Sequence, residues 1–349
     1  MSSKIIVTNY SRSGRELRWR RIWIRKSLDS ICHALELVLP PSERPNVRRH
    51  DRIQVRIANP LITDSGGRRL VTTALVDEVE TAAGASGHSV TVLGRSPARD
   101  IVDSTWSDDR WVNPETTTPH TLAEIVGSIA EKFGIDFAWL PTDVPDPTGH
   151  VNFFAWQNET PWQKIITEAD SQEFLFTSNG AGGLHLWRVA HAPRVEGFHV
   201  TEGQNARSIT LRENGAEQFH RYVVTGNFEE VEEAVDHECP PGRVMTIDMT
   251  GFDVTREKMR NRALLERNRR REVRAAVAVS GWGLSDGQIA ALGDTAGKYV
   301  FWGPNFMVPV RAPTVGLDEP LLVAEVEHEA DHEAMQTTLT LTRRAAYLL

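Results

Sequence analysis

One block of strand-like segments occurs twice in this sequence, once near each end, and it constrains the fold more than any other feature. The first copy reads RIQVRI, LVTTALVDEVE and HSVTVLGR, and the second reads MVPVRA, LLVAEVE and TTLTLTR in the same order. The interval from Val79 to Arg95 is 16 residues, and the interval from Val326 to Arg343 is 17. The alternation predicts strands with one buried face each. We therefore expect a duplicated β module, although two unrelated hairpins would share part of this character.

The strands that open each module align less closely. WRRIWIRKSLDSICHALELVL in the first half corresponds loosely to ARSITLRENGAEQFHRYVVTG in the second. In the first 103 residues, RRIWIR and HALELVL precede the repeated block, and segments with Pro, Gly, Asn and Asp separate the strands. Five strands in about a hundred residues predict a sandwich or a closed barrel, since closure removes exposed edges.

Residues 104–190 have a different pattern, with helices and a hairpin. Thr121 and Glu124 form a capping box before an apolar stripe at helical spacing, and Thr160 with Pro161 predicts the start of a second helix. EFLFTSNGAGGLHLWR then indicates two strands around a glycine-rich turn. These features predict an α/β domain between the two β modules.

The second β module is predicted to be discontinuous, formed by residues 191–227 and 273–349. An insert at 228–272 interrupts it. The acidic run NFEEVEEAVDHE contains six acids, and the segment TREKMRNRALLERNRRREVR contains nine Lys or Arg against three Glu. The expected fold class is therefore mainly β with α+β insertions.

Composition limits the function classes. A net charge of −8 argues against polyanion binding by the surface as a whole. Cys32 and Cys239 are far apart and have no cysteine cluster around them, so neither a disulfide framework nor a cysteine metal site is expected. We find no apolar run of the length that a membrane span needs and no signal-peptide pattern, which predicts synthesis in the cytoplasm without membrane insertion.

The string HEADH, with His328, Glu329 and His332, matches a zinc-hydrolase motif. That motif requires a helix, yet this copy lies between two β-rich runs, LLVAEVE and MQTTLTLT. Met335 and Thr338 stand where the extended form of the motif has Gly and His. We therefore expect an exposed hairpin loop and reject a metal site, and a zinc-dependent hydrolase remains the alternative function.

The arginine-rich segment at 256–274 predicts a basic helix. Arg260, Arg267 and Arg270 belong to a row dense enough to span several phosphates. The other interpretation is a helix that faces solvent, a partner or the acidic run just before it.

Three stretches resemble the Mu-type baseplate hub proteins of contractile phage tails, which are also similar to the T-even hub and the type VI secretion spike hub. The stretches are LVDEVETAAGASGHSVTVLGRSPARDIVDSTW, RNRALLERNRRREVRAAVAVSGW and VRAPTVGLDEPLLVAEVEHEADHEAMQTTLTLTRR. The most specific elements are GRS followed by D-x-V-D (Asp100, Val102 and Asp103), the arginine-rich helix that runs into a V-x-V-x-G-W strand, and the terminal hairpin. Residues 104–190 match in pattern more than in letters.

The resemblance implies two tube-like β-barrel domains per chain with smaller α/β domains attached, and a homotrimeric ring that joins a hexameric tail tube to a trimeric spike. The implied partners are the chain itself and the spike and tube proteins, with the tape measure and baseplate wedge proteins as further contacts. It further implies a virion location, no enzymatic activity, no cofactor and a bore through which DNA passes without specific binding. The interface candidates are Arg95, Asp100, Asp103, Arg260, Arg267 and Arg270.

A bore that lets DNA pass should be neutral or acidic, because each phosphate held by a fixed cation adds salt-dependent affinity. Asp77 and Glu325 are candidates for solvent-facing acids, and the arginine-rich helix should point away from the bore. A hub from a phage-tail-like bacteriocin or a secretion spike would have the same residues. A generic binding protein that uses the α/β domain is a further alternative.

Overall fold

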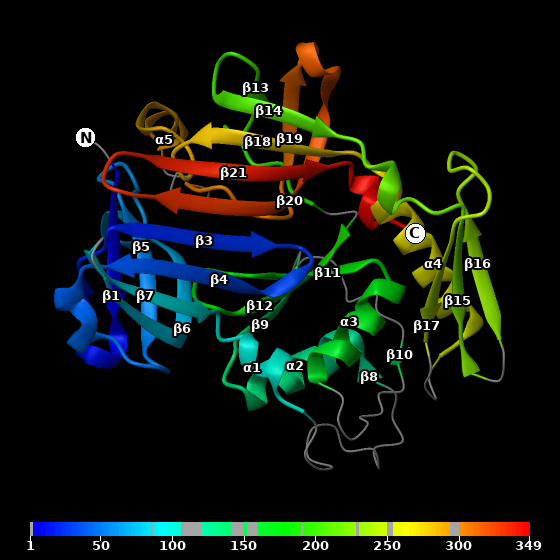
Figure 1. Cartoon of the computed structure of the whole chain (residues 1–349), viewed down its shortest axis with the longest axis horizontal. Helices are drawn as coiled ribbons and strands as arrows, with labels where there is room; N and C mark the ends of the chain where they lie inside the picture. The colour runs from blue at the N-terminus through cyan, green and yellow to red at the C-terminus, as the bar shows by residue number, and fades with distance from the viewer. Residues whose placement is uncertain are drawn as a thin grey trace.

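The computed structural model describes residues 3–84, 87–105, 120–140, 150–151, 160–189, 192–227, 230–249, 254–293 and 300–349. Its largest unit is a 13-stranded sheet that contains strands from both ends of the chain (Figure 1). The path of paired strands is β14 (Ala206–Arg212), β18 (Arg274–Ser280), β21 (Met335–Thr342), β20 (Leu317–Ala330), β3 (Arg21–Ser27), β4 (Ser30–Leu39), β7 (Gly87–Arg95), β6 (Arg68–Gly84), β5 (Arg52–Ala58), β1 (Lys4–Asn9) and β2 (Arg15–Leu17). Off this path, β19 (Met307–Ala312) pairs with β20, and β13 (Val200–Thr201) pairs with β19. The fold is mainly β, as the alternating segments predict.

The two β modules have the same strand order. In the first module the order is β5-β6-β7-β4-β3, and in the second it is β19-β20-β21-β18-β14. The register agrees as well, because a bulge between Val76 and Glu78 of β6 matches a bulge between Val323 and Glu325 of β20. A bulge inserts one extra residue and fixes the local pairing. Two unrelated hairpins would therefore not be expected to have a bulge at the same position. The predicted duplication of the repeated block is therefore confirmed.

The match of the opening strands is partly wrong. By register, β14 is the equivalent of β3 in the second module, as expected, but the equivalent of β4 is β18. The segment expected to match β4 contains β15 (Arg221–Thr225), and β15 instead belongs to a separate small sheet. The error arose because the second module has its insert between the two strands that form a tight hairpin in the first.

The two predicted barrels do not appear as separate closed units among the described strands. The outer edge of β3 pairs with β20 of the other module, with Arg25 opposite Glu327 and Ile22 opposite Ala330. In the second module, β13 and β14 are joined only by an isolated bridge between Glu202 and Ala206. The described strands thus form one continuous sheet, because a strand edge that could have closed a barrel is used to join the modules.

A single large apolar cluster lies along one face of this sheet. Alternating residues of both modules contribute to it, and Ile22, Ile24, Leu37, Val326 and Leu339 are fully buried. Each such side chain stabilises the fold by about 1.5–3 kcal/mol relative to exposure. On the opposite face, β20 bears Glu325 and Glu329, which are both partly exposed.

The α/β unit between the modules contains α2 (Leu122–Lys132), α3 (Pro161–Ser171) and the sheet β11-β12-β9, where β11 spans Phe174–Ser178, β12 Leu184–Arg188 and β9 Phe137–Leu140. The capping box at Thr121 and Glu124 is confirmed, and Thr160 caps α3 in the same way. A short pair, β8 (His120–Thr121) and β10 (His150–Val151), lies beside them. The glycine-rich turn contacts the first module closely, since a Cβ at Gly180 would lie 2.6 Å from the carbonyl oxygen of Leu70.

The insert forms a sheet of β16 (Val231–Val235), β15 and β17 (Val244–Asp248), with α4 (Arg256–Arg271) packed on it. Met259 and Ala263 of the helix pack against Tyr222 and Val224 of the sheet. The other two α-helices of the described residues are short, α1 (Arg99–Asp103) after β7 and α5 (Asp286–Leu292) after β18. No helix in the described part of the chain has the length and hydropathy to cross a membrane.

Candidate functional site

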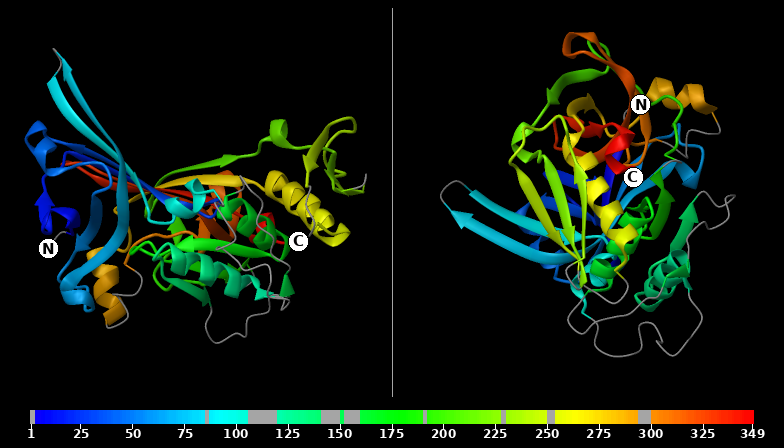
Figure 2. Two further views of the ribbon diagram at one scale, coloured as in Figure 1. Left: turned by 90° about the horizontal axis from the view of Figure 1, so that it is seen from below. Right: turned by 90° about the vertical axis from the view of Figure 1, so that its right-hand side faces the viewer.

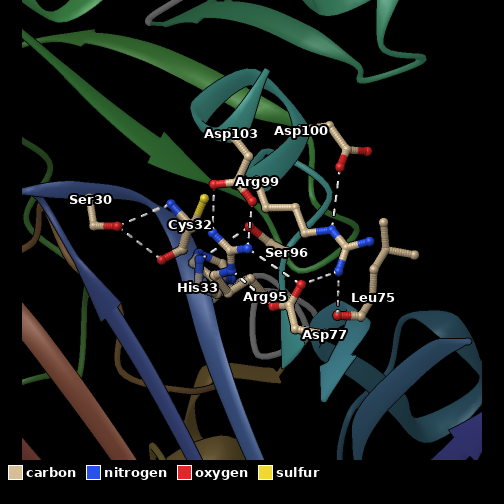
Figure 3. Close-up of polar contacts among 10 residues, drawn as sticks. All are labelled: Ser30, Cys32, His33, Leu75, Asp77, Arg95, Ser96, Arg99, Asp100 and Asp103. Atoms are coloured by element: carbon tan, nitrogen blue, oxygen red, sulfur yellow. Dashed lines mark hydrogen bonds and ion pairs between the residues drawn. The ribbon is translucent and has the colours of Figure 1, made fainter. Parts of the chain in front are cut away.

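The GRSPARDIVD segment forms a cluster of ion pairs at the end of β7 (Figure 3). Arg95 donates from Nε to Asp77 Oδ2 at 2.9 Å and from its two Nη atoms to the Asp103 carboxylate at 3.0 and 2.6 Å. Arg99 pairs with Asp77 as well and donates to the carbonyl oxygen of Leu75 at 3.3 Å. It also donates to Asp100 at 3.3 Å. Two arginines therefore share one aspartate.

Local structure explains why these residues meet. Asp77 is the extra residue of the bulge in β6, and a bulge redirects the side chain it carries. The segment after β7 is held on β4 by two hydrogen bonds, from Ser96 N to His33 O at 2.9 Å and from His33 N to Ser96 Oγ at 3.1 Å. The one-turn helix α1 then carries Arg99 and Asp103 back toward the bulge.

The charges in this cluster are mutually compensated. Hydrogen bonds to Asp103 and Asp77 raise the pKa of Arg95, and the same contact with Arg95 lowers the pKa of Asp103. Cys32 lies beside the cluster, and burial raises its pKa to about 12. A thiol with that pKa is a poor nucleophile at neutral pH.

Three of the interface candidates, Arg95, Asp100 and Asp103, are thus brought together by the structure. Their side chains remain 36%, 47% and 52% exposed, so the cluster reaches the surface. Two further members were not among the interface candidates: Arg99 was not singled out in the sequence, and Asp77 was expected only as a solvent-facing acid. Asp77 lies in the repeated block 18 residues before Arg95, and its charge at a position occupied by an apolar residue in the second copy was a usable signal.

The other interface candidates lie on α4, which also forms ion pairs within the chain. Two of its basic residues, Arg262 and Arg269, contact the buried Asp170 of α3 at 2.6 and 3.0 Å. Lys258 contacts the buried Glu168 at 2.7 Å. The helix also pairs with acidic residues of the insert, Arg256 with Glu230 and Arg271 with Glu238. The basic row is therefore largely neutralised by neighbouring elements.

Arg260, Arg267 and Arg270 differ in their surroundings. Arg260 is exposed, Arg267 donates to Asn268 at 2.9 Å, and Arg270 pairs with Glu266 at 3.2 Å. The guanidinium of Arg270 also lies 5.9 Å from the Phe219 ring centroid. Of the three, Arg260 is the one most available to an external partner.

The HEADH segment is a strand end and a turn, which confirms the predicted hairpin context. His328 is in β20, and β20 ends at Ala330. The expectation of a wholly exposed loop is wrong, because His328 is fully buried and bonded to Thr337 Oγ1 at 3.0 Å and to Trp302 O at 3.1 Å. Glu329 points to the other face and contacts Arg21 at 2.8 Å, and His332 stacks on Trp19 in the turn. The two imidazoles therefore do not converge on one point as zinc ligands must.

A buried basic group near the junction of the modules was not predicted. Lys26 is buried, donates to the carbonyl oxygen of Val71 at 2.7 Å and lies 5.0 Å from the Phe301 ring centroid. Burial lowers its pKa to about 7. Burial, followed by the charge of Lys26, also holds the pKa values of His33 and His328 well below their usual range. The alternation of RIWIRK, which puts Lys26 on the same face as Ile22 and Ile24, was the available signal.

Comparison with known proteins gave no matching family model and no match among curated proteins. Solved structures do match. The 43 kDa tail protein of prophage MuSo2 from Shewanella oneidensis aligns with a TM-score of 0.73 and 22% identity, over 99% of each chain. The tail protein from Neisseria meningitidis MC58 aligns with a TM-score of 0.74 and 14% identity, over 99% of this chain and 98% of that one.

A third match comes from a secretion system. A component of the Escherichia coli type VI secretion system, described as structurally similar to the T4 bacteriophage tail proteins gp27 and gp5, aligns with a TM-score of 0.52 and 10% identity. The alignment covers 98% of this chain and 76% of that protein. The chain therefore has, over nearly its whole length, the fold of prophage tail proteins, in agreement with its resemblance to the Mu-type baseplate hubs.

Proposed function

We propose that this chain is the structural hub of a contractile phage or phage-like tail baseplate, which forms a trimeric ring between the hexameric tail tube and the trimeric central spike. The role is non-enzymatic and requires no cofactor. The observation that carries the proposal is the internal duplication, in which two modules with one strand order and one bulge register occur in a chain with a tail-protein fold.

The duplication supports this role through symmetry. Three chains, each with two similar modules, present six near-equivalent positions to a sixfold tube and keep threefold symmetry toward a spike. A ring of three chains with one module each would match the threefold symmetry of the spike but not the sixfold symmetry of the tube. The proposed partners are accordingly the chain itself, the tube protein and the spike protein, with tape measure and wedge proteins as further contacts.

Charge on the polar face of the sheet supports the proposed DNA conduit. Glu325, Glu327 and Glu329 follow one another on this face of β20. Burial and the neighbouring carboxylates raise the pKa of Glu327, which is typical of a row of like charges. Glu325 pairs with Arg25 and Asp77 belongs to the ion-pair cluster, so neither is a free acid. A bore lined by this face would be acidic or balanced and would not retain DNA.

The arrangement of α4 is compatible with the same proposal. Its basic residues are directed at Asp170, Glu168 and the acidic insert, which leaves few free cations for phosphate binding. A hub of a secretion spike is the second candidate, favoured by the alignment with the type VI secretion component. The genes beside this one distinguish the two, because a virion needs capsid and tape measure genes and a secretion spike does not.

The experiment that tests the proposal measures assembly and partner binding together. We expect light scattering of the purified chain to give the mass of three chains, and co-expression with the spike protein encoded nearby to give a stable complex. Duplex DNA should not be retained by the ring at physiological salt. A chain that stays monomeric at high concentration, alone and with the spike, contradicts the hub assignment.

A further inference from the structure

A cavity of about 630 Å³ lies where the hairpin of the α/β unit meets the first module and the loop before β19. The left view of Figure 2 shows the α/β unit, in teal and green, against one side of the large sheet. The turn of the hairpin forms one wall and approaches β6 closely at Gly180. Residues of β5 and β6 form the second wall, and residues 303–306 with Phe301 form the third. A cavity of this size is typical of sites that hold a small organic ligand.

The described residues that line this cavity include four cationic side chains and no acidic one. The four are Lys26, Arg56, Arg68 and Arg69. Arg69 forms an ion pair with Asp64, which lies outside the cavity and balances the charge of this arginine. The positive charge of the cavity therefore comes from the other three.

Those three cations have no acidic partner in the part of the chain that the structure describes. Arg56 donates to the Tyr10 hydroxyl at 2.6 Å, and this contact leaves its charge uncompensated. Arg68 is exposed and has no ion pair among the described residues. Since the chain as a whole has a net charge of −8, three uncompensated cations beside one cavity favour an anionic ligand.

Lys26 gives the strongest reason for such a ligand. Its side chain belongs to a residue that is only 4% exposed, and lysines buried to this extent are normally paired with an opposite charge. Its Nζ donates to the carbonyl oxygen of Val71 and lies over the Phe301 ring, and both groups are uncharged. Desolvation lowers the pKa of Lys26 to about 7, which shows that these contacts do not compensate the charge. An anion in the cavity would provide the counter-ion.

Aromatic side chains complete the lining. Trp187, Phe301 and Phe306 are half-buried at the cavity. The indole Nε1 of Trp187 donates to Thr177 Oγ1 at 2.8 Å, which fixes the orientation of that ring. Aromatic side chains beside cations are typical of sites where a flat ring stacks and a phosphate is neutralised.

We propose that this cavity binds a small phosphate ester that carries a flat aromatic group, such as a nucleoside monophosphate. A phosphate is favoured over a carboxylate because it carries a charge of about −1.5 to −2 at neutral pH, closer to that of the cations around it. The planar fork of an arginine also matches the oxygens of a phosphate. All the lining residues belong to one chain, so the inference does not depend on the hub function or on trimer formation.

The site is compatible with a ring that does not retain DNA. A cavity of about 630 Å³ holds one small ligand, and a duplex cannot enter it. The free nucleotide should also bind at least roughly tenfold more tightly than a single strand of about five nucleotides with the same terminal phosphate. A strand that binds better than the free nucleotide overturns the assignment to a small molecule.

Isothermal titration calorimetry of the full chain tests the proposal, with adenosine monophosphate, adenosine and inorganic phosphate as probes. We expect one nucleotide per chain, and adenosine and phosphate should each bind at least roughly tenfold more weakly because each lacks one half of the ligand. Inorganic phosphate that binds as tightly as the nucleotide overturns the assigned ligand class. If none of the four common nucleoside monophosphates binds at millimolar concentration, the proposal is wrong.

Variants of two lining residues locate the site. Lys26→Met and Arg68→Gln should each weaken nucleotide binding by roughly tenfold, typical of a lost charge-assisted contact. Arg68 is exposed, so its substitution should leave the urea unfolding midpoint unchanged and any loss of binding cannot come from misfolding. Arg52→Gln is the matched control, because Arg52 is an exposed arginine of β5 outside the cavity. An equal loss in this control indicates general attraction to the surface and rejects the site.

Discussion

Asp77 and Ala324 occupy the same position in the two modules, since each is the extra residue of the bulge between the long strand and its neighbour. Asp77 binds two arginines there, whereas Ala324 packs in an apolar cluster with Leu322 and Tyr347. The short helices that follow the modules also differ in this way. The helix α1 carries the charged Arg99 and Asp103, whereas the 3-10 helix Arg344–Tyr347 carries the buried Ala346 and Tyr347. The modules thus share a backbone and have diverged in chemistry at this position.

The first prediction concerns the ion-pair cluster. Asp77→Ala should lower the free energy of unfolding by about 1–3 kcal/mol, because the nearly buried Arg99 loses its carboxylate. Urea unfolding measures the change. Asp100→Ala is the matched control, since its exposed contact with Arg99 should contribute less than about 1 kcal/mol. Equal effects of the two variants would contradict the assigned role of Asp77.

The second prediction concerns the buried lysine. The pKa of Lys26 is about 7 in the folded chain and near its usual 10.5 when unfolded. Between these values the unfolded state binds the extra proton, so the Lys26 contribution to stability should rise with pH by up to about 1.4 kcal/mol per unit from pH 7 to 10. Below pH 7 both states are protonated and the penalty stays constant.

Lys26→Met isolates this effect, because other groups titrate equally in both proteins. We expect the difference in unfolding free energy between the variant and the natural chain to shrink as the pH is raised from 7 to 10. Chemical denaturation at four pH values within this range measures it. A difference that does not change with pH shows that Lys26 keeps an ordinary pKa.

The third prediction separates the two histidines of HEADH. His328→Ala should destabilise the fold by roughly 2–4 kcal/mol, since it removes a buried ring together with its hydrogen bonds to Thr337 and to the carbonyl oxygen of Trp302. His332→Ala should change stability by less than about 1 kcal/mol, because the ring lies at the turn. Elemental analysis should find no stoichiometric zinc, and one zinc per chain that is lost in the double variant would support the hydrolase alternative.

The fourth prediction concerns α4. Arg262→Ala should destabilise the chain by about 1–3 kcal/mol because the buried Asp170 loses a partner, and thermal unfolding measures this loss. Arg260→Ala, two residues away, should leave the melting temperature nearly unchanged because that side chain is exposed. If Arg260 instead contacts a tail partner, its substitution should weaken only the assembled complex.

The sequence by itself determined the local structure of this protein. Alternation defined the strands of both modules, the capping boxes at Thr121 and Thr160 defined two helix starts, and the repeated block predicted the duplication. These features depend on contacts between residues a few positions apart in the sequence or on the alternation of polar and apolar residues along a strand. The hairpin context of HEADH followed from the same local evidence.

Only the tertiary structure decided which distant strands they pair with. Whether the outer edge of β3 pairs with its own module or with β20, about 300 residues away, depends on backbone groups that every residue carries, so no side-chain pattern records it. The same holds for β18, which takes in the second module the place that β4 takes in the first, although a long insert separates it from β14. Lys26 and His328 are buried because distant segments cover them, with Val71 and Phe301 beside Lys26 and Trp302 beside His328.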